Sequence, residues 1–95
     1  MRLSEQRDLL RDCLHVWAID GKIEVEEEGV SVVTADGAFT LTAADPDLRP
    51  VRWFLQTPER RAVGAAPRAI PSIGAALSRL RNALGADGGV APRFS

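Results

Sequence analysis

The dipeptide Asp36-Gly37 constrains this chain most, because it separates two segments that both have the pattern of a β-strand. The segment VSVVT (30–34) is rich in β-branched residues, and in AFTLTA (38–43) Phe39 and Leu41 alternate with threonines. An Asp-Gly pair between two such segments is among the strongest short-range signals for a hairpin turn. We therefore expect an antiparallel hairpin whose Phe39 and Leu41 face the core.

Two further segments show the same period of two, which is the period of side chains along a strand. KIEVEEE (22–28) alternates Ile23 and Val25 with glutamates. In VRWFLQT (51–57) the apolar set Val51, Trp53 and Leu55 alternates with Arg52, Phe54 and Gln56. Together the four segments predict an antiparallel meander, with the face that carries Arg52 and Phe54 left in water.

A helix is expected before the first strand. Apolar residues recur at helical spacing in Leu9, Leu10, Cys13, Leu14 and Trp17. Ser4 is the expected N-cap, and Gly21 is the candidate for the left-handed residue that ends the helix. The segment HVWAI-DG-KIEV also has the pattern of a hairpin, in which case the helix would stop near Leu14. We favour the longer helix, from about residue 4 to residue 18.

A second helix is expected near the end of the chain. Ser72 is its N-cap, and Ile73, Leu77, Leu80 and Leu84 step by four, three and four residues along one stripe up to Gly85. The predicted fold class is α+β, a two-layer sandwich of an N-terminal helix, a four-stranded antiparallel meander and a C-terminal helix that covers the same sheet face. Residues 1–85 are expected to form a single domain, and residues 86–95 a disordered tail.

The segment TPERRAVGAAPRAIP (57–71) has no clear period and contains three prolines. A connection of this length is uncommon in a compact domain and is usually functional or mobile. We predict a long arginine-bearing loop here, with a short extension of the fourth strand through residues 60–63 as the alternative.

Charge is divided unequally along the chain, although the formal net charge is only −1. Residues 1–48 hold four basic and eleven acidic residues, a net charge of −7, whereas residues 49–95 hold eight arginines and two acids, a net charge of +6. Such a division is compatible with a basic binding face. We favour the alternative interpretation, that the two halves neutralise each other in the folded domain.

Catalytic and metal-binding patterns are absent from the sequence. Cys13 and His15 are the single cysteine and histidine; on a helix they point about 200° apart, which separates a nucleophile from its base. One thiol and one imidazole do not make a conventional zinc site, and no glycine-rich phosphate loop is present. We predict a protein that is not an enzyme and needs no cofactor.

The predicted function is that of a small interaction module. It would bind a protein partner, or a second copy of itself, through the arginine-bearing loop and the exposed sheet face. The candidate partner-binding residues are Arg52, Phe54, Arg60, Arg61 and Arg68. The alternative is a nucleic-acid-binding domain in which the four arginines contact phosphates. The lone cysteine and the lack of an apolar N-terminal run favour a cytoplasmic protein without a membrane partner.

Overall fold

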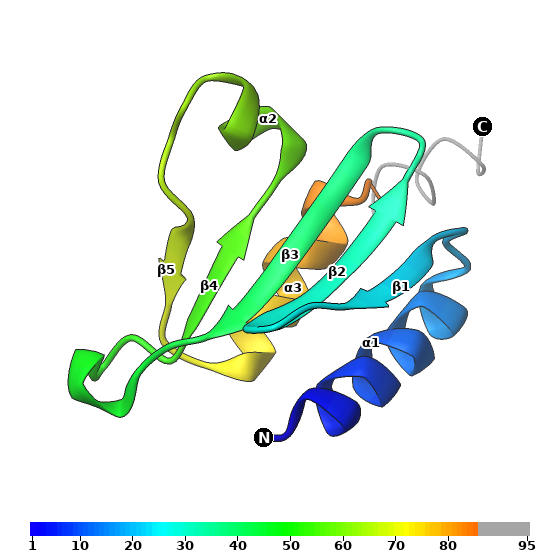
Figure 1. Ribbon diagram of the computed structural model, residues 1–95. Coiled ribbons are helices and arrows are strands. Elements are labelled where there is room, and N and C mark those ends of the chain that lie inside the picture. The colour runs from blue at the N-terminus through cyan, green and yellow to red at the C-terminus, as the bar shows by residue number, and fades with distance from the viewer. Residues whose placement is uncertain (86–95) are drawn as a thin grey trace.

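A computed structural model describes residues 1–85. The elements are α1 (Leu3–Trp17), β1 (Lys22–Val25), β2 (Gly29–Thr34), β3 (Gly37–Ala43), a 3-10 turn η1 (Pro46–Leu48), β4 (Trp53–Gln56), α2 (Pro58–Ala62), β5 (Arg68–Ile70) and α3 (Ile73–Ala83). The five strands form one antiparallel sheet in the order β1-β2-β3-β4-β5 (Figure 1). The predicted tail lies outside the described residues.

The predicted α+β meander with a helix before and after it is confirmed, and the sheet has five strands instead of four. The Asp36-Gly37 turn connects β2 to β3, where Thr34 pairs with Gly37 and Val32 with Phe39. Gly37 has φ of 125°, a backbone conformation that residues other than glycine rarely adopt. The backbone conformation of this turn therefore requires the glycine of the Asp-Gly pair.

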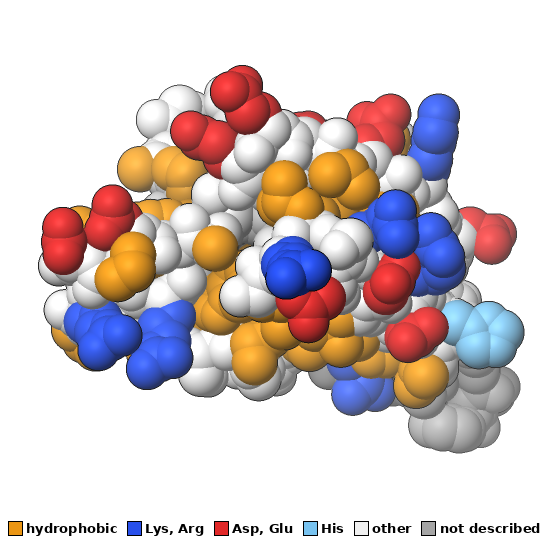
Figure 2. All heavy atoms as spheres, turned by 60° about the horizontal axis from the view of Figure 1, so that its bottom comes forward, with side chains coloured by type: hydrophobic (Ala, Val, Ile, Leu, Met, Phe, Trp, Pro, Cys, Tyr) orange, Lys and Arg blue, Asp and Glu red, His pale blue; other side chains and the backbone are white. Residues whose placement is uncertain are grey.

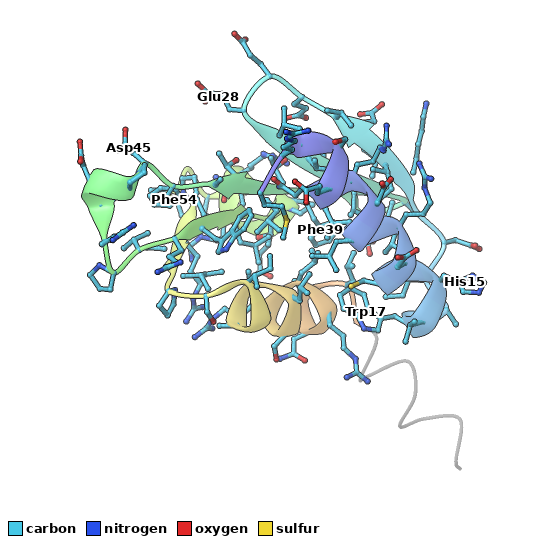
Figure 3. All side chains as sticks on the ribbon, turned by 90° about the horizontal axis from the view of Figure 1, so that it is seen from below. His15, Trp17, Glu28, Phe39, Asp45 and Phe54 are labelled. Carbon is cyan, nitrogen blue, oxygen red and sulfur yellow. The ribbon has the colours of Figure 1, made fainter. Side chains whose placement is uncertain are left out.

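Both long helices cover one face of the sheet. α1 lies against β1 and β2, whereas α3 contacts β4 and β5. Figure 1 shows α3 behind the sheet, and Phe39 lies between the sheet and α3 (Figure 3). The core residues alternate with open-face residues along each strand. They are Leu10 and Leu14 from α1, Ala76 and Leu80 from α3, and Val30, Val32, Phe39, Leu41, Trp53, Leu55 and Ile70 from the sheet.

One polar side chain, Gln6, enters this core, and the sequence pattern did not predict it. Gln6 is only 1% exposed, and its Nε2 donates a hydrogen bond of 2.7 Å to the backbone carbonyl of Leu41. A buried amide needs such a partner to offset the loss of water. The bond ties the first turn of α1 to the middle of β3.

The limits of α1 correct two predictions. Ser4 lies inside the helix and not at its cap; the carboxylate of Glu5 accepts a hydrogen bond of 3.1 Å from the backbone N–H of Arg2. The helix runs to Trp17, as the longer alternative predicted, but Ala18 and not Gly21 is its left-handed C-cap, with φ of 56°. The N–H of Ile19 then donates to the carbonyl of Leu14 at 3.0 Å, which closes the end.

Two strands are shorter than the sequence predicted. β1 ends at Val25, and residues 26–28 form the turn to β2, where the N–H of Glu26 donates to the carbonyl of Gly29 at 2.8 Å. β4 begins at Trp53, because the residues between η1 and Trp53 form a turn and a connection that are not part of the strand. In both strands the alternating pattern of residues extends beyond the paired residues into the adjoining turn.

Residues 57–71 contain two short elements, so the predictions of a long loop and of a strand through 60–63 are both wrong. Thr57 caps α2 by accepting the N–H of Arg60 at 3.3 Å, Pro58 occupies the first turn, and Glu59 follows. These are ordinary helix-start signals. A helix of five residues and a strand of three are too short to produce a visible hydrophobic period.

The predicted second helix is confirmed in α3. Ser72 accepts a hydrogen bond of 3.1 Å from the N–H of Ala75, as an N-cap should. Gly85, with φ of 78°, follows the last turn, and its N–H donates to the carbonyl of Asn82 at 3.0 Å. The helix therefore starts and stops where its sequence signals lie.

Substitution of Ala18 by glycine is expected to stabilise the protein by about 1 kcal/mol, because glycine removes the steric cost of a left-handed residue at the end of α1. Urea denaturation followed by circular dichroism measures the change. The control is Ala75→Gly inside α3, where glycine should lower stability by about 1 kcal/mol. A loss of stability in both variants would contradict the assignment of Ala18 as the left-handed cap.

Candidate anion-binding site

The sheet divides the five residues predicted to bind a partner between its two faces. Phe54 is paired with Thr42 and Ala69, which places it on the open face. Arg68 is the register partner of Leu55, a core residue, so the Arg68 side chain belongs to the face that the helices cover. The predicted residues therefore do not form one continuous surface.

The open face carries a hydrogen-bonded chain that crosses the sheet. Arg61 Nη2 donates to Thr40 Oγ1 at 2.6 Å, and Arg61 Nη1 donates to the carbonyl of Ala38. Ser31 Oγ donates to Glu26 Oε1 at 2.7 Å and lies 2.7 Å from Thr40 Oγ1. Since the single hydroxyl proton of Ser31 goes to Glu26, Thr40 must donate to Ser31. The chain therefore runs in one direction, from a guanidinium through two hydroxyls to a carboxylate.

These hydrogen bonds hold the Arg61 side chain against the open face of the sheet. Ser31 is fully buried although it lies on the open face, so its two hydrogen bonds replace water. Hydrogen bonds in series between opposite charges polarise and strengthen each other. The chain also connects the acidic turn after β1 to the basic α2, which is one place where the two oppositely charged halves of the sequence compensate each other.

Arg60 is held on the other side of the same short helix. Its Nε and Nη2 both donate to the carbonyl of Ala66, at 2.9 and 2.8 Å. Gln56 Nε2 donates to the neighbouring carbonyl of Ala65 at 3.0 Å, and these bonds close the segment between β4 and β5. The Nη1 group of Arg60 makes no hydrogen bond to any residue from 1 to 85. Arg60 is therefore a cation in a fixed position with donor capacity left over.

A hollow of about 320 Å³ lies where α2, β5 and the end of α3 meet. Three arginines from these three elements line it, namely Arg60, Arg68 and Arg79. The other lining residues are Leu55, Thr57, Glu59, Asn82 and Ala83. We call this the arginine hollow.

The cations of the arginine hollow are not neutralised by the described chain. The side chains of Arg68 and Arg79 have no hydrogen bond or ion pair with another residue in the range 1–85, and Glu59 is the one carboxylate among the lining residues. The ion pairs Arg7–Asp8, Arg11–Asp8 and Lys22–Glu24 lie elsewhere, on α1 and β1. The surface around α1 accordingly shows both signs of charge side by side (Figure 2). The hollow thus concentrates unpaired positive charge.

Two further hollows border the same strands. One, of about 320 Å³, shares Thr57, Glu59 and Ala83 with the arginine hollow and is otherwise lined by Asp36, Phe39 and Pro58. The other, of about 260 Å³, lies at the opposite end of β4 and includes Arg49 and Arg52. Arg52 is therefore separated from Arg68 both by the sheet and by the length of β4.

The sequence pattern indicated Arg60 and Arg68 as candidates but did not indicate Arg79. Arg79 lies beside the apolar stripe of α3, next to the buried Leu80, and Arg81 points to another side of the helix. Only the position of β5 relative to α3 brings Arg68 and Arg79 to one place. The local signal that could have indicated Arg79 is its position beside the apolar stripe of α3, near the end of that helix.

Cys13 and His15 lie on α1 and do not line the arginine hollow. Burial raises the pKa of the Cys13 thiol, and the nearby charge of Asp12 raises it further, so the reactive thiolate is disfavoured. Within residues 1–85, no cluster of three or more His, Cys, Asp or Glu side chains is placed to hold a metal ion. No helix of that same range has the length and apolarity to cross a membrane.

Comparison with protein families, with curated proteins and with solved structures found no match. We therefore infer function from the geometry of the described residues.

Replacement of Thr40 by valine is expected to lower the free energy of unfolding by about 1–3 kcal/mol, because Ser31 loses a buried donor and Arg61 loses an acceptor. Thr42→Val is the matched control. It lies two residues along the same strand face, and its hydroxyl has no hydrogen bond within the described range. Equal effects of the two substitutions in urea denaturation would show that the chain of hydroxyls contributes nothing to stability.

Cys13 is expected to react slowly with iodoacetamide at mildly alkaline pH, since its raised pKa leaves little thiolate. Alkylation followed by mass spectrometry should be clearly faster for the urea-unfolded chain, after correction with a free small thiol measured in the same urea. Equal rates for the folded and unfolded chain would contradict the protection of this thiol.

Proposed function

We propose that this protein is a small, non-enzymatic interaction module that binds a protein partner by receiving an anionic group of that partner in the arginine hollow. The observation that carries the proposal is the convergence of Arg60, Arg68 and Arg79 from three elements, with Arg68 and Arg79 unpaired within the described residues. Guanidinium groups held near each other repel, and an anion between them relieves that repulsion.

The shape of the hollow favours a single anionic group over an extended polymer. Its volume is at the lower end of the range of small-ligand pockets. Nucleic acid needs a track of cations along a backbone, and residues 1–85 do not provide one. Arg61 is committed to Thr40, Arg52 lies at the far end of β4, and the turn at residues 26–28 is acidic. A protein partner with one inserted acidic group fits better.

The proposal identifies binding and not catalysis as the role of the hollow. Its side chains are mostly hydrogen-bond donors, and the thiol and the imidazole of the chain lie on α1, away from it. The partner can be a second copy of this chain, because residues 26–28 present three glutamates on an exposed turn. Light scattering as a function of salt distinguishes self-association from binding to another protein.

Titration with a hexaglutamate peptide at low salt tests the proposal. The NMR signals of the Arg68 and Arg79 side chains should shift. The double variant Arg68→Ala/Arg79→Ala should bind the peptide at least about tenfold more weakly, because it loses one or more charge-assisted hydrogen bonds. The matched control is Arg7→Ala/Arg11→Ala on α1, which removes the same charge and should bind normally.

A third variant, Arg52→Ala/Phe54→Ala, tests the open sheet face directly. Loss of binding in this variant with normal binding in Arg68→Ala/Arg79→Ala would overturn the assignment of the site to the hollow. Labelled single-stranded and duplex DNA form a further arm. Tight DNA binding that weakens steeply with salt would replace the protein partner with nucleic acid.

A further inference from the structure

We propose that the group received by the arginine hollow is a phosphomonoester, such as the phosphate of a phosphorylated side chain, and not a carboxylate. This inference rests on the proposed function and names the chemistry of its ligand. It follows from the charge, the number of donors and the surroundings of the hollow.

The charge of the hollow matches a dianion. Arg60, Arg68 and Arg79 contribute three positive charges and Glu59 one negative charge, which leaves +2. A phosphomonoester carries about −1.5 to −2 at neutral pH, whereas a carboxylate carries −1. A carboxylate would leave one positive charge unmatched in the hollow, and a phosphomonoester would leave almost none.

The donors of the hollow exceed what a carboxylate can accept. The guanidinium N–H groups of Arg68 and Arg79 make no hydrogen bonds to the described residues, and Arg60 retains Nη1. The amide of Asn82 and the hydroxyl of Thr57 add further donors at the same wall. Two carboxylate oxygens accept about four hydrogen bonds. Three terminal phosphate oxygens accept more, and each suits the forked geometry of arginine.

The three cations also approach from different directions. Arg60 comes from α2, Arg68 from β5 and Arg79 from α3. A planar carboxylate presents its two oxygens along one edge, whereas the oxygens of a phosphate point to three sides of a tetrahedron. A donor set contributed by three separate elements therefore fits a tetrahedral group better than a planar one.

The adjoining hollow provides space for what the phosphate is attached to. It shares Thr57, Glu59 and Ala83 with the arginine hollow and adds the apolar Phe39 and Pro58. A phosphate on a side chain can therefore lie among the arginines while the attached carbon atoms contact Pro58 and Phe39. Inorganic phosphate lacks these carbon atoms and should bind more weakly than a phosphorylated peptide.

The test compares four probes by calorimetry and NMR at low salt: a short peptide with phosphoserine between two alanines, the same peptide with glutamate in that position, inorganic phosphate, and acetate. The phosphoserine peptide should bind at least about tenfold more tightly than the glutamate peptide, since it adds one or more charge-assisted hydrogen bonds. Inorganic phosphate should bind between these two, and acetate most weakly.

Substitutions of the arginines test whether the phosphoserine peptide binds in the arginine hollow. Arg68→Ala and Arg79→Ala should each reduce affinity for the phosphoserine peptide at least about tenfold, and Arg68→Lys, which keeps the charge but loses the fork, should fall between wild type and Arg68→Ala. Arg7→Ala/Arg11→Ala should leave affinity unchanged. Arg68 and Arg79 are both exposed, so these substitutions should leave the circular dichroism spectrum unaltered.

The outcomes separate the two proposals. Equal or tighter binding of the glutamate peptide at Arg68 and Arg79 would overturn the phosphomonoester and keep the docking of a protein partner. Binding of inorganic phosphate as tightly as the phosphoserine peptide, without signal changes at Phe39 or Pro58, would support the phosphate group and contradict a protein source. Absence of any shift at Arg68 and Arg79 with the phosphoserine peptide would overturn the inference itself.

Discussion

The pairing of β2 with β3 is the interaction on which the rest of this structure depends. Their inward residues Val30, Val32, Phe39 and Leu41 are buried in the core cluster to which α1 contributes Leu10 and Leu14 and α3 contributes Ala76 and Leu80. Hydrogen bonds from other elements also end on these strands: Gln6 reaches the carbonyl of Leu41 from α1, and Arg61 reaches the carbonyl of Ala38 and the hydroxyl of Thr40 from α2. Because the two attachments lie on opposite faces, the hairpin holds α1 and α2 in place independently.

The uneven distribution of charge along the sequence is only partly balanced in the fold. Arg61 is connected to Glu26 through two hydroxyls, so one cation of the basic half and one acid of the acidic half are coupled across the sheet. The arginine hollow is different, because Glu59 is the single acid on its wall. A chain with thirteen acidic residues that leaves such a cluster unmatched within its described part retains charge that an anionic ligand can neutralise.

Sequence analysis predicted the elements that depend on local signals. The alternation of apolar residues located the strands through Val32, Phe39, Leu41 and Leu55, and Ser72 located the start of α3. It did not predict α2 or β5, since elements of five and three residues carry no period. It also missed the burial of Gln6, because the Nε2 group of that side chain donates to a carbonyl 35 positions away in the chain. The site was predicted in part, since Arg60 and Arg68 were named but their separation from Arg52 and Phe54 was not.

The register of β5 decides which of two candidate surfaces the arginine side chains form. The side chains of a strand alternate between faces, so a shift of one residue would turn Arg68 to the open face, beside Phe54. The single basic surface that the sequence predicted would then form, and the arginine hollow would lose one of its three cations. Ile70 prevents this shift: it is fully buried opposite Trp53, and its exposure in the shifted register would cost about 1.5–3 kcal/mol. One apolar residue therefore determines the position of the arginine, and with it the location of the candidate site.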